Sequence, residues 1–330
     1  MLNNENFTLQ WNITKECEYK CGYCYLNQQT NFEMINSNII LSEIIKFRTL
    51  FSNFRINITG GNPLLHVDFE KIVECLYKEN IKVRILGNPI HSDFIDKLKS
   101  VAKFIDYYQL SLDGTKGQLL NRGSDNVATV WESVDILNSI NIKPTIMFTL
   151  TSNNKNEIIP IIEDCIKKNV HSFTFSRLVV NQKNTLKYKN NDLVRDYKTT
   201  LQYMFDFLVE NNVGIFNFKD NLWKLLLYEN GLYTPNSDCI TGCSMGISSI
   251  CIMPNGDIYP CSRLPLNLGN IQVSKLIDIW ENHQVLSELR NFQNYQKCKK
   301  CILVNNCRGC PAIAYAESGS YLEKDPYCWN

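Results

Sequence analysis

The sequence predicts an α/β fold, in which a parallel sheet, open or curled into a partial barrel, is followed by a small cysteine-rich extension. Two observations support this prediction. Runs rich in β-forming residues alternate with helical patterns through the middle of the chain, as in parallel sheets with helical crossovers. The 14 cysteines are concentrated near the two ends. A length of 330 residues indicates about two domains.

Six strands and five helices account for the predicted sheet. The strands are runs rich in Ile, Val, Phe, Tyr and Thr: 7–13, 55–59, 82–86, 107–112, 145–150 and 172–178. The helical segments between them are 39–50, 69–79, 93–100, 127–138 and 157–168. In the second helix, apolar residues recur at helical spacing, and Asp68 stands where an N-cap is expected.

A further helix over 192–210 is expected to bridge the sheet and the extension. The stretch 229–238 that follows is rich in turn-forming residues and makes the best domain boundary. We therefore expect a first domain over residues 1–230 and a second over 231–330.

Charge and composition exclude several classes of partner. The net charge of +1 provides no bulk attraction to nucleic acid or to an anionic membrane. Residues 1–7 are polar and lack the features of a secretory signal. The charge-free run 239–256 contains three Gly, an Asn and a Pro, so it is not a membrane span. We expect a cytoplasmic protein that contacts neither membrane nor nucleic acid.

The placement of the cysteines favours metal ligation. Disulfides are rare in chains without a secretory signal. Small disulfide-rich domains carry their cysteines throughout, whereas here they gather near the ends. Three cysteines in predicted helices or an apolar strand are expected to be core thiols instead: Cys75, Cys165 and Cys251.

The first group of cysteines follows the first predicted strand directly. Residues 16–26 read ECEYKCGYCYL, which places Cys17, Cys21 and Cys24 in a C-x3-C-x2-C pattern. Three thiolates on one loop can hold three irons of a [4Fe-4S] cube and leave the fourth iron open for a substrate. A zinc site with a distant fourth ligand and simple buried thiols are the alternatives. Zinc ligands more often come as two C-x2-C pairs, so the spacing favours iron and sulfur.

This loop, with Tyr23 before its third cysteine, resembles that of the radical S-adenosylmethionine (SAM) enzymes, and the resemblance implies a SAM contact for Tyr23. In that family the amino and carboxylate groups of SAM chelate the open iron. Reductive cleavage then yields a 5′-deoxyadenosyl radical that takes a hydrogen atom from substrate. The resemblance implies a partial (βα)6 barrel, a SAM-binding [4Fe-4S] cluster and SAM itself as cofactors.

Two further motifs resemble SAM-binding segments of the same family. The run TGGNPL after the second strand is similar to the family's Gly-Gly-Glu-Pro turn, which implies SAM contacts for Gly60, Gly61, Asn62 and Pro63. Asn62 stands where the family usually has Glu, so it can accept a hydrogen bond from the methionine ammonium but adds no charge.

The run LSLDG and the NRG that follows it resemble the family's SLDG and RG pattern, which implies contacts from Ser111, Asp113 and Arg122 near the ribose and carboxylate of SAM. Ligands at the carboxyl edge of the strands are typical of parallel β/α folds. Asn153 and Arg177, at the ends of the fifth and sixth strands, are weaker candidates for cofactor contacts. A solvated surface position for Arg122, and structural roles for the other two, are the alternatives.

The C-terminal cysteines resemble the SPASM extension of radical SAM maturases, which holds two auxiliary [4Fe-4S] clusters. The run IMPNGDIYPC and the later LGNI and IW segments match that extension. By analogy, the first auxiliary cluster is held by Cys239, Cys243, Cys261 and Cys310, and the second by Cys298, Cys301, Cys307 and Cys328. Only Arg308 and Gly309 separate Cys307 from Cys310, one residue fewer than usual, so we expect Cys310 to be shifted or one iron to be ligated differently. A zinc ribbon is the alternative for the paired cysteines.

The resemblance implies a radical SAM enzyme that acts on a peptide or small protein, forming a thioether or carbon–carbon crosslink or epimerising a residue. One alternative is a formylglycine-forming enzyme of the anaerobic sulfatase-maturating type, in which an Asp base follows the hairpin cysteine; here that position is Ser262. Alternatives from other classes are a non-catalytic iron–sulfur electron carrier or redox sensor, and a zinc-organised binding module.

The implied partners are a low-potential electron donor of flavodoxin or ferredoxin type and the peptide substrate. The loop with the first three cysteines (residues 16–26, the cluster loop) has its first cysteine at Cys17, so we expect no fused peptide-recognition domain before it. We therefore expect a leader peptide to be held by the barrel rim or by a separate leader-peptide-binding protein.

Overall fold

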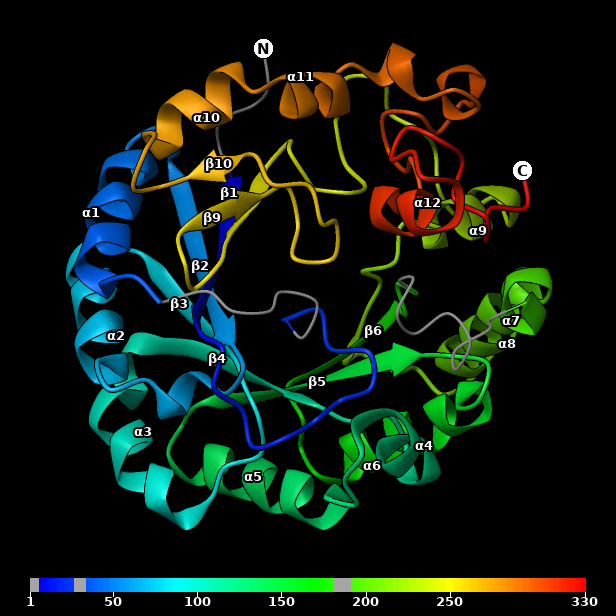
Figure 1. The fold of residues 1–330 in the computed structure, drawn as a ribbon. Helices are drawn as coiled ribbons and strands as arrows, with labels where there is room; N and C mark the ends of the chain where they lie inside the picture. Colours follow the sequence, from blue (N-terminus) through cyan, green and yellow to red (C-terminus); the bar gives the residue numbers. More distant parts are fainter. Residues whose placement is uncertain (1–5, 27–33, 181–190) are drawn as a thin grey trace.

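The computed structural model describes residues 6–26, 34–180 and 191–330, and its central feature is one ten-stranded sheet curled into a partial barrel (Figure 1). The sheet order is β10-β9-β8-β1-β2-β3-β4-β5-β6-β7, and β1 to β7 are parallel neighbours. Their bounds are β1 (Asn6–Thr14), β2 (Asn53–Gly60), β3 (Lys82–Leu86), β4 (Ile105–Ser111), β5 (Lys143–Leu150), β6 (Ser172–Arg177) and the short β7 (Phe216–Asn217). The predicted α/β fold and its six strands are confirmed.

Helices cover the outer face of the barrel (Figure 1). The predicted ones are confirmed as α1 (Ser37–Arg48), α2 (Phe69–Lys78), α3 (Ile95–Val101), α5 (Val127–Ser139) and α6 (Ile158–Lys167). Helix α4 (Thr115–Arg122) was not predicted. Single 3-10 turns lie at η2 (Pro63–Leu65), η3 (Ser92–Phe94), η4 (Ala102–Phe104) and η5 (Lys155–Glu157). Asp68 does precede α2, but its carboxylate accepts a bond from Ser37 Oγ at 3.3 Å instead of capping the helix.

The predicted single helix over 192–210 is wrong in one respect. It consists of two helices, α7 (Asn191–Arg195) and α8 (Tyr197–Glu210), which meet at Asp196. Asp favours helix ends over interiors. The Asp196 carboxylate forms ion pairs with Arg195 at 3.1 Å and with Lys155 at 3.7 Å.

The C-terminal part of the chain, residues 223–330, is called the tail here and continues the barrel sheet. Strand β8 (Ser249–Ile252) pairs in parallel with β1, and β9 (Asp257–Tyr259) returns antiparallel to β8 through a turn at Gly256, whose φ is +83°. Strand β10 (Gly269–Asn270) pairs with β9. The predicted boundary between residues 230 and 231 therefore does not separate two sheets.

The rest of the tail consists of short helices joined by turns and irregular segments. Its helices are α9 (Trp223–Glu229), α10 (Leu276–Asn282), α11 (Gln284–Arg290) and α12 (Pro311–Ser318), with 3-10 turns η6 (Phe292–Asn294) and η7 (Cys298–Lys300). Tail and barrel share one hydrophobic core, in which Trp280 of α10 packs edge-on against Phe7 of β1 with ring centroids 4.9 Å apart. Aromatic contacts of this kind add to the free energy of burial.

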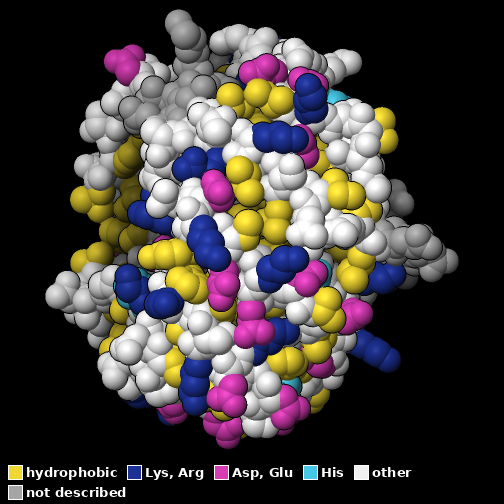
Figure 2. All heavy atoms as spheres, turned by 90° about the vertical axis from the view of Figure 1, so that its left-hand side faces the viewer, with side chains coloured by type: hydrophobic (Ala, Val, Ile, Leu, Met, Phe, Trp, Pro, Cys, Tyr) yellow, Lys and Arg dark blue, Asp and Glu magenta, His cyan; other side chains and the backbone are white. Residues whose placement is uncertain are grey.

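The surface carries charges of both signs. On the face formed by the outer helices at the left of Figure 1, Lys and Arg side chains alternate with Asp and Glu (Figure 2), in keeping with the net charge of +1. In the part of the chain that the structure describes, no helix is both long enough and apolar enough to cross a membrane.

Candidate cofactor site

The cluster loop leaves the end of β1 and runs across the inside of the ring of strands (Figure 1). The turn after β2 holds its first residues, because Gly61 N–H donates to Thr14 C=O at 2.9 Å and Asn62 N–H donates to Glu16 C=O at 2.6 Å. A Cβ on Gly61 would lie 2.0 Å from the Glu16 carbonyl oxygen, so only glycine permits this approach. The two glycines of the predicted SAM-binding turn thus also seat the backbone of the cluster loop.

The second half of the loop is held by α4 and the turn before it. Gly22 N–H donates to Asn121 C=O at 3.0 Å. The Tyr23 hydroxyl donates to the Asp113 carboxylate, which also forms an ion pair with Arg122, Nε to Oδ2 at 3.0 Å. The guanidinium of Arg122 lies 5.5 Å from the centroid of the Tyr23 ring. Three residues that the sequence assigned to SAM therefore form one unit that touches the loop.

Electrostatics stabilise this unit in its charged form. Burial alone would lower the pKa of Arg122, but the carboxylate of Asp113 outweighs it and raises that pKa. Burial raises the pKa of Tyr23 well above its usual value, so its hydroxyl remains a donor. Asp113 is fully buried and accepts a further bond from Thr149 N–H at 2.8 Å.

Asn154, which the sequence did not single out, is buried beside the turn that carries Asp113. Its Nδ2 donates to the carbonyl oxygens of Asp113 and Thr149, both at 2.9 Å, whereas Asn153 is exposed. Ser111 is half-buried at the end of β4. SAM contacts for Ser111 and Asn153 stay predictions.

Arg177 is fully engaged with protein groups. It pairs with Asp220 at 2.7 Å and with Asp325 at 2.8 Å, and its guanidinium lies 5.0 and 4.7 Å from the ring centroids of Tyr197 and Tyr327, which contact each other edge-on. These contacts join the end of β6 to the tail. A SAM contact for Arg177 stays a prediction, beside this structural role.

Asn62 also has protein partners in the described residues. Its Oδ1 accepts from Leu64 N–H at 3.1 Å and so caps the turn η2. Its Nδ2 donates to the carboxylate of Glu18 at 2.7 Å. Glu18 lies between Cys17 and Cys21 in the cluster loop, and no sequence motif marks it as a site residue.

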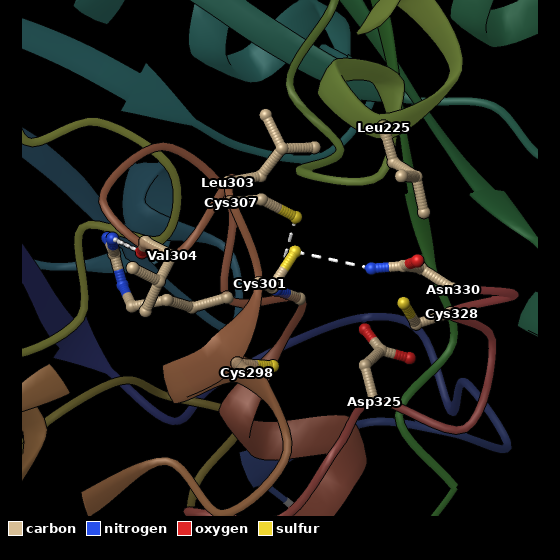
Figure 3. Close-up of a pocket in the computed structure, with 11 residues that line it drawn as sticks. Leu225, Cys298, Cys301, Leu303, Val304, Cys307, Asp325, Cys328 and Asn330 are labelled. Atoms are coloured by element: carbon tan, nitrogen blue, oxygen red, sulfur yellow. Dashed lines mark hydrogen bonds between the residues drawn. The ribbon is translucent and has the colours of Figure 1, made fainter. Parts of the chain in front are cut away.

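Four tail cysteines line one pocket. Cys298, Cys301, Cys307 and Cys328 direct their sulfur atoms toward a common space (Figure 3), and they are the four predicted for the second auxiliary cluster. Asn330 Nδ2 donates to the Cys301 sulfur at 3.3 Å. Hydrogen bonds to the sulfurs are one of the means by which proteins set cluster potentials.

Three cysteines of the other predicted set lie around Arg263. Burial would lower the pKa of Arg263, but Cys310, Cys261 and Cys243 together raise it. Cys239, the fourth member of that set, is exposed. Its place in the first auxiliary cluster stays a prediction.

The short link between Cys307 and Cys310 is accommodated by the backbone. Arg308 and Gly309 are both left-handed, with φ of +63° and +60°. Cys307 faces the pocket of Figure 3 while Cys310 lies with Cys243 and Cys261. Two successive left-handed residues thus separate the two cysteines into different groups across a link of two residues.

The donor chemistry of the loop and tail fits iron–sulfur clusters. In the cluster loop and in both groups of tail cysteines, the predicted ligands are free cysteine thiols, which are the side chains that ligate iron–sulfur clusters. Asn121, beside the cluster loop, is fully buried, and neither polar atom of its amide has a partner in the described residues. An unpaired buried amide is costly and fits a site that receives a polar ligand. In residues 6–26, 34–180 and 191–330, no three Cys, His, Asp or Glu side chains converge on a point where they could hold a single metal ion.

Residues 11–165 match the radical SAM superfamily, and residues 243–302 match the SPASM iron–sulfur cluster-binding domain. Among curated proteins, the AdoMet-dependent heme synthase of Methanosarcina barkeri is 22% identical over 99% of this chain and 97% of its own length. The subtilosin biosynthesis protein AlbA of Bacillus subtilis is 24% identical over 96% of this chain and 69% of its own length.

Among solved structures, Streptococcus suis SuiB bound to S-adenosylmethionine superposes with a TM-score of 0.78 and 20% identity, over 99% of this chain and 78% of SuiB. That likeness shows the fold. With the cluster loop, the glycine turn and the grouped thiols of the tail, the chain belongs to the radical SAM superfamily and carries a SPASM domain, so that its cofactors are SAM, the [4Fe-4S] cluster that binds it and auxiliary iron–sulfur clusters.

Proposed function

We propose that this radical SAM enzyme is a peptide maturase, which forms a thioether or carbon–carbon crosslink in a ribosomally made peptide or epimerises one of its residues. The observation that carries the proposal is the joint presence of a SAM-type cluster loop and tail thiols grouped as in SPASM proteins. AlbA, which is 24% identical over 96% of this chain, is a bacteriocin biosynthesis protein. When bound, the reduced cluster and SAM supply the chemistry of hydrogen-atom abstraction from a C–H bond.

Two sets of residues serve the proposed cofactor site: one would ligate the cluster, and the other positions the loop that carries these ligands. Cys17, Cys21 and Cys24 would ligate the SAM-binding cluster, and the unit of Tyr23, Asp113 and Arg122 fixes the loop that carries them. The predicted SAM contacts of Gly60, Gly61, Asn62 and Pro63 lie at the turn that seats the same loop. Ser111, Asn153 and Arg177 complete the proposed set.

The proposed auxiliary clusters lie in the tail, close to where the barrel ends. Arg177 at the end of β6 pairs with Asp325, and Asp325 lines the pocket of Cys298, Cys301, Cys307 and Cys328. Asp325 also accepts a bond from Cys310 N–H at 2.8 Å. One buried carboxylate therefore touches both proposed cluster sites and the barrel.

A heme-forming reaction is the second candidate. Its support is that the alignment with the Methanosarcina barkeri heme synthase spans 97% of that protein, whereas the alignment with AlbA spans 69% of AlbA. The formylglycine alternative is disfavoured because Ser262 cannot replace the Asp base expected after Cys261. A non-catalytic electron carrier would bind no SAM, so the presence of the SLDG and RG motifs argues against that alternative.

A low-potential flavodoxin or ferredoxin is the proposed electron donor. Three exposed lysines surround Cys298 in and beside η7: Lys297, Lys299 and Lys300. Such donors carry net negative charge, so opposite charge favours their encounter at this surface. Reversing the three charges should slow turnover with flavodoxin at low salt and leave turnover with dithionite unchanged.

A separate leader-peptide-binding protein is the proposed partner for presenting the substrate.

The test of the proposed function uses the anaerobically reconstituted protein with SAM and dithionite. The probe is the peptide encoded by a short open reading frame, rich in Cys or aromatic residues, next to the gene. Mass spectrometry should show loss of two hydrogen atoms for a crosslink, or deuterium incorporation from D2O at unchanged composition for epimerisation. An unmodified peptide, together with heme formed from a heme precursor offered in parallel, would instead establish the heme-forming reaction.

A further inference from the structure

The cluster loop carries a carboxylate at the turn where the family's glutamate is replaced. Asn62 contributes no charge to the methionine ammonium of SAM, although the family usually has Glu there. Glu18 Oε1 accepts from Asn62 Nδ2 at 2.7 Å, which brings the Glu18 carboxylate within one hydrogen bond of the side chain at position 62. The negative charge that Asn62 lacks is therefore provided beside it by Glu18, which lies 44 positions earlier in the chain.

A second amide fixes the other oxygen of that carboxylate. Asn88 Nδ2 donates to Glu18 Oε2 at 3.1 Å and also to Cys17 Sγ at 3.2 Å. The carboxylate thus lies next to a thiol that would ligate the SAM-binding cluster. Because each carboxylate oxygen has more than one acceptor position, Glu18 can still accept from an ammonium group while it keeps both amides.

The alternative ligand for the ammonium is Asn62 itself, and its geometry is less favourable. Its Oδ1, the only acceptor atom on that side chain, already accepts from Leu64 N–H at 3.1 Å, so a single acceptor position is left for the ammonium. Its Nδ2 is a donor, like the ammonium, and points to Glu18. A charged acceptor also binds an ammonium more strongly than a neutral amide does.

We propose that Glu18 binds the ammonium group of SAM and replaces the glutamate that the family has at the position of Asn62, so that Asn62 and Asn88 act as positioning residues for its carboxylate. The proposal rests on SAM binding, which follows from family membership, and not on a peptide substrate. Failure to find a peptide product would leave it unaffected, and its own failure would leave the peptide proposal unaffected.

The test compares SAM affinity in variants of the reconstituted full-length protein, with iron content measured for each. Glu18→Gln should raise the dissociation constant of SAM about tenfold, as loss of a charge-assisted bond predicts. The same variant should bind 5′-methylthioadenosine, which has no ammonium group, as the wild type does. Glu16→Gln is the matched control, an exposed glutamate on the same loop, and should change SAM affinity by less than about twofold.

A swap variant makes the result decisive. In Glu18→Gln/Asn62→Glu the carboxylate returns to the family's position, so SAM affinity should recover to near the wild-type value. Unchanged SAM affinity in Glu18→Gln would overturn the proposal, and so would equal weakening of SAM and 5′-methylthioadenosine. Failure of the swap to recover affinity, or loss of iron from both Glu18 variants, would assign Glu18 to loop structure and also overturn it.

Discussion

Arg122 and Asp113 form an ion pair, Nε to Oδ2 at 3.0 Å, in which the carboxylate is completely buried and also accepts from Tyr23 of the cluster loop. The pair joins the end of α4 to the turn after β4. It therefore fixes the loop that carries the three cluster cysteines from the side opposite the glycine turn. Disturbing this pair should affect both folding and the cofactor site.

Replacing Asp113 with Asn should destabilise the protein by about 3 kcal/mol, because breaking a buried pair leaves the other charge without a counter-ion. The free energy of unfolding is measured by urea denaturation under anaerobic conditions. Asp106→Asn is the control, since Asp106 forms a partly exposed pair with Arg84 at 3.3 Å and its loss should cost under about 1 kcal/mol. Equal losses in the two variants would contradict the role given to Asp113.

Replacing Cys17, Cys21 or Cys24 with Ala should abolish formation of 5′-deoxyadenosine. Each change would remove a proposed ligand of the cluster to which SAM binds, so that SAM would no longer be cleaved. The product is measured by liquid chromatography after incubation with SAM and dithionite. Cys75→Ala, a half-buried cysteine on α2 with no expected ligand role, should retain activity. Deoxyadenosine formation by any of the three loop variants would argue against the assignment.

Replacing Cys298 with Ala should separate SAM cleavage from product formation. The change removes one ligand from the pocket of Figure 3 and leaves the cluster loop intact. We expect about four fewer irons per chain, if the weakened cluster is lost entirely, with deoxyadenosine still formed and the peptide unmodified. Product at the wild-type rate would show that this cluster has no part in the reaction.

Replacing Gly309 with Ala should disrupt the link between the two auxiliary sites. A Cβ at this position would lie 2.4 Å from Cβ of Asp325, in addition to the cost of φ at +60°. Gly231→Ala shares the positive φ, at +71°, but its Cβ would meet nothing within 4 Å. Melting temperature and iron content should therefore fall more for Gly309→Ala. Equal effects would mean that the contact with Asp325 contributes nothing.

The strands and most barrel helices were predictable because their signals are local. β-branched and aromatic runs mark β2, β5 and β6, and helical spacing of apolar residues marks α2. Helix α4 was missed because its buried face consists of Gly117, Gln118 and Asn121, whereas its two leucines are exposed, so apolar spacing does not mark the face that packs inward. The break between α7 and α8 is a single residue, Asp196, and apolar periodicity does not reveal so short an interruption.

The site was predictable where a motif fixes residue types at short spacing, as in the cluster loop. Contacts between distant segments were not. Glu18 meets Asn62 across 44 positions, and β8 pairs with β1 with Ser249 opposite Thr8. The choice between Asn153 and Asn154 depends on how the turn after β5 directs each side chain, and two adjacent asparagines give no sequence signal for it.

The central claim is that the cluster held by Cys17, Cys21 and Cys24 keeps its fourth iron, which no cysteine ligates, open to SAM. Electron paramagnetic resonance of the reduced, oxygen-free protein tests it most directly, when SAM labelled with 15N at its amino group is titrated in. The account predicts a changed cluster spectrum and a resolved coupling between the cluster and the labelled nitrogen. A spectrum that SAM leaves unaltered, in protein with its full iron content, would contradict it.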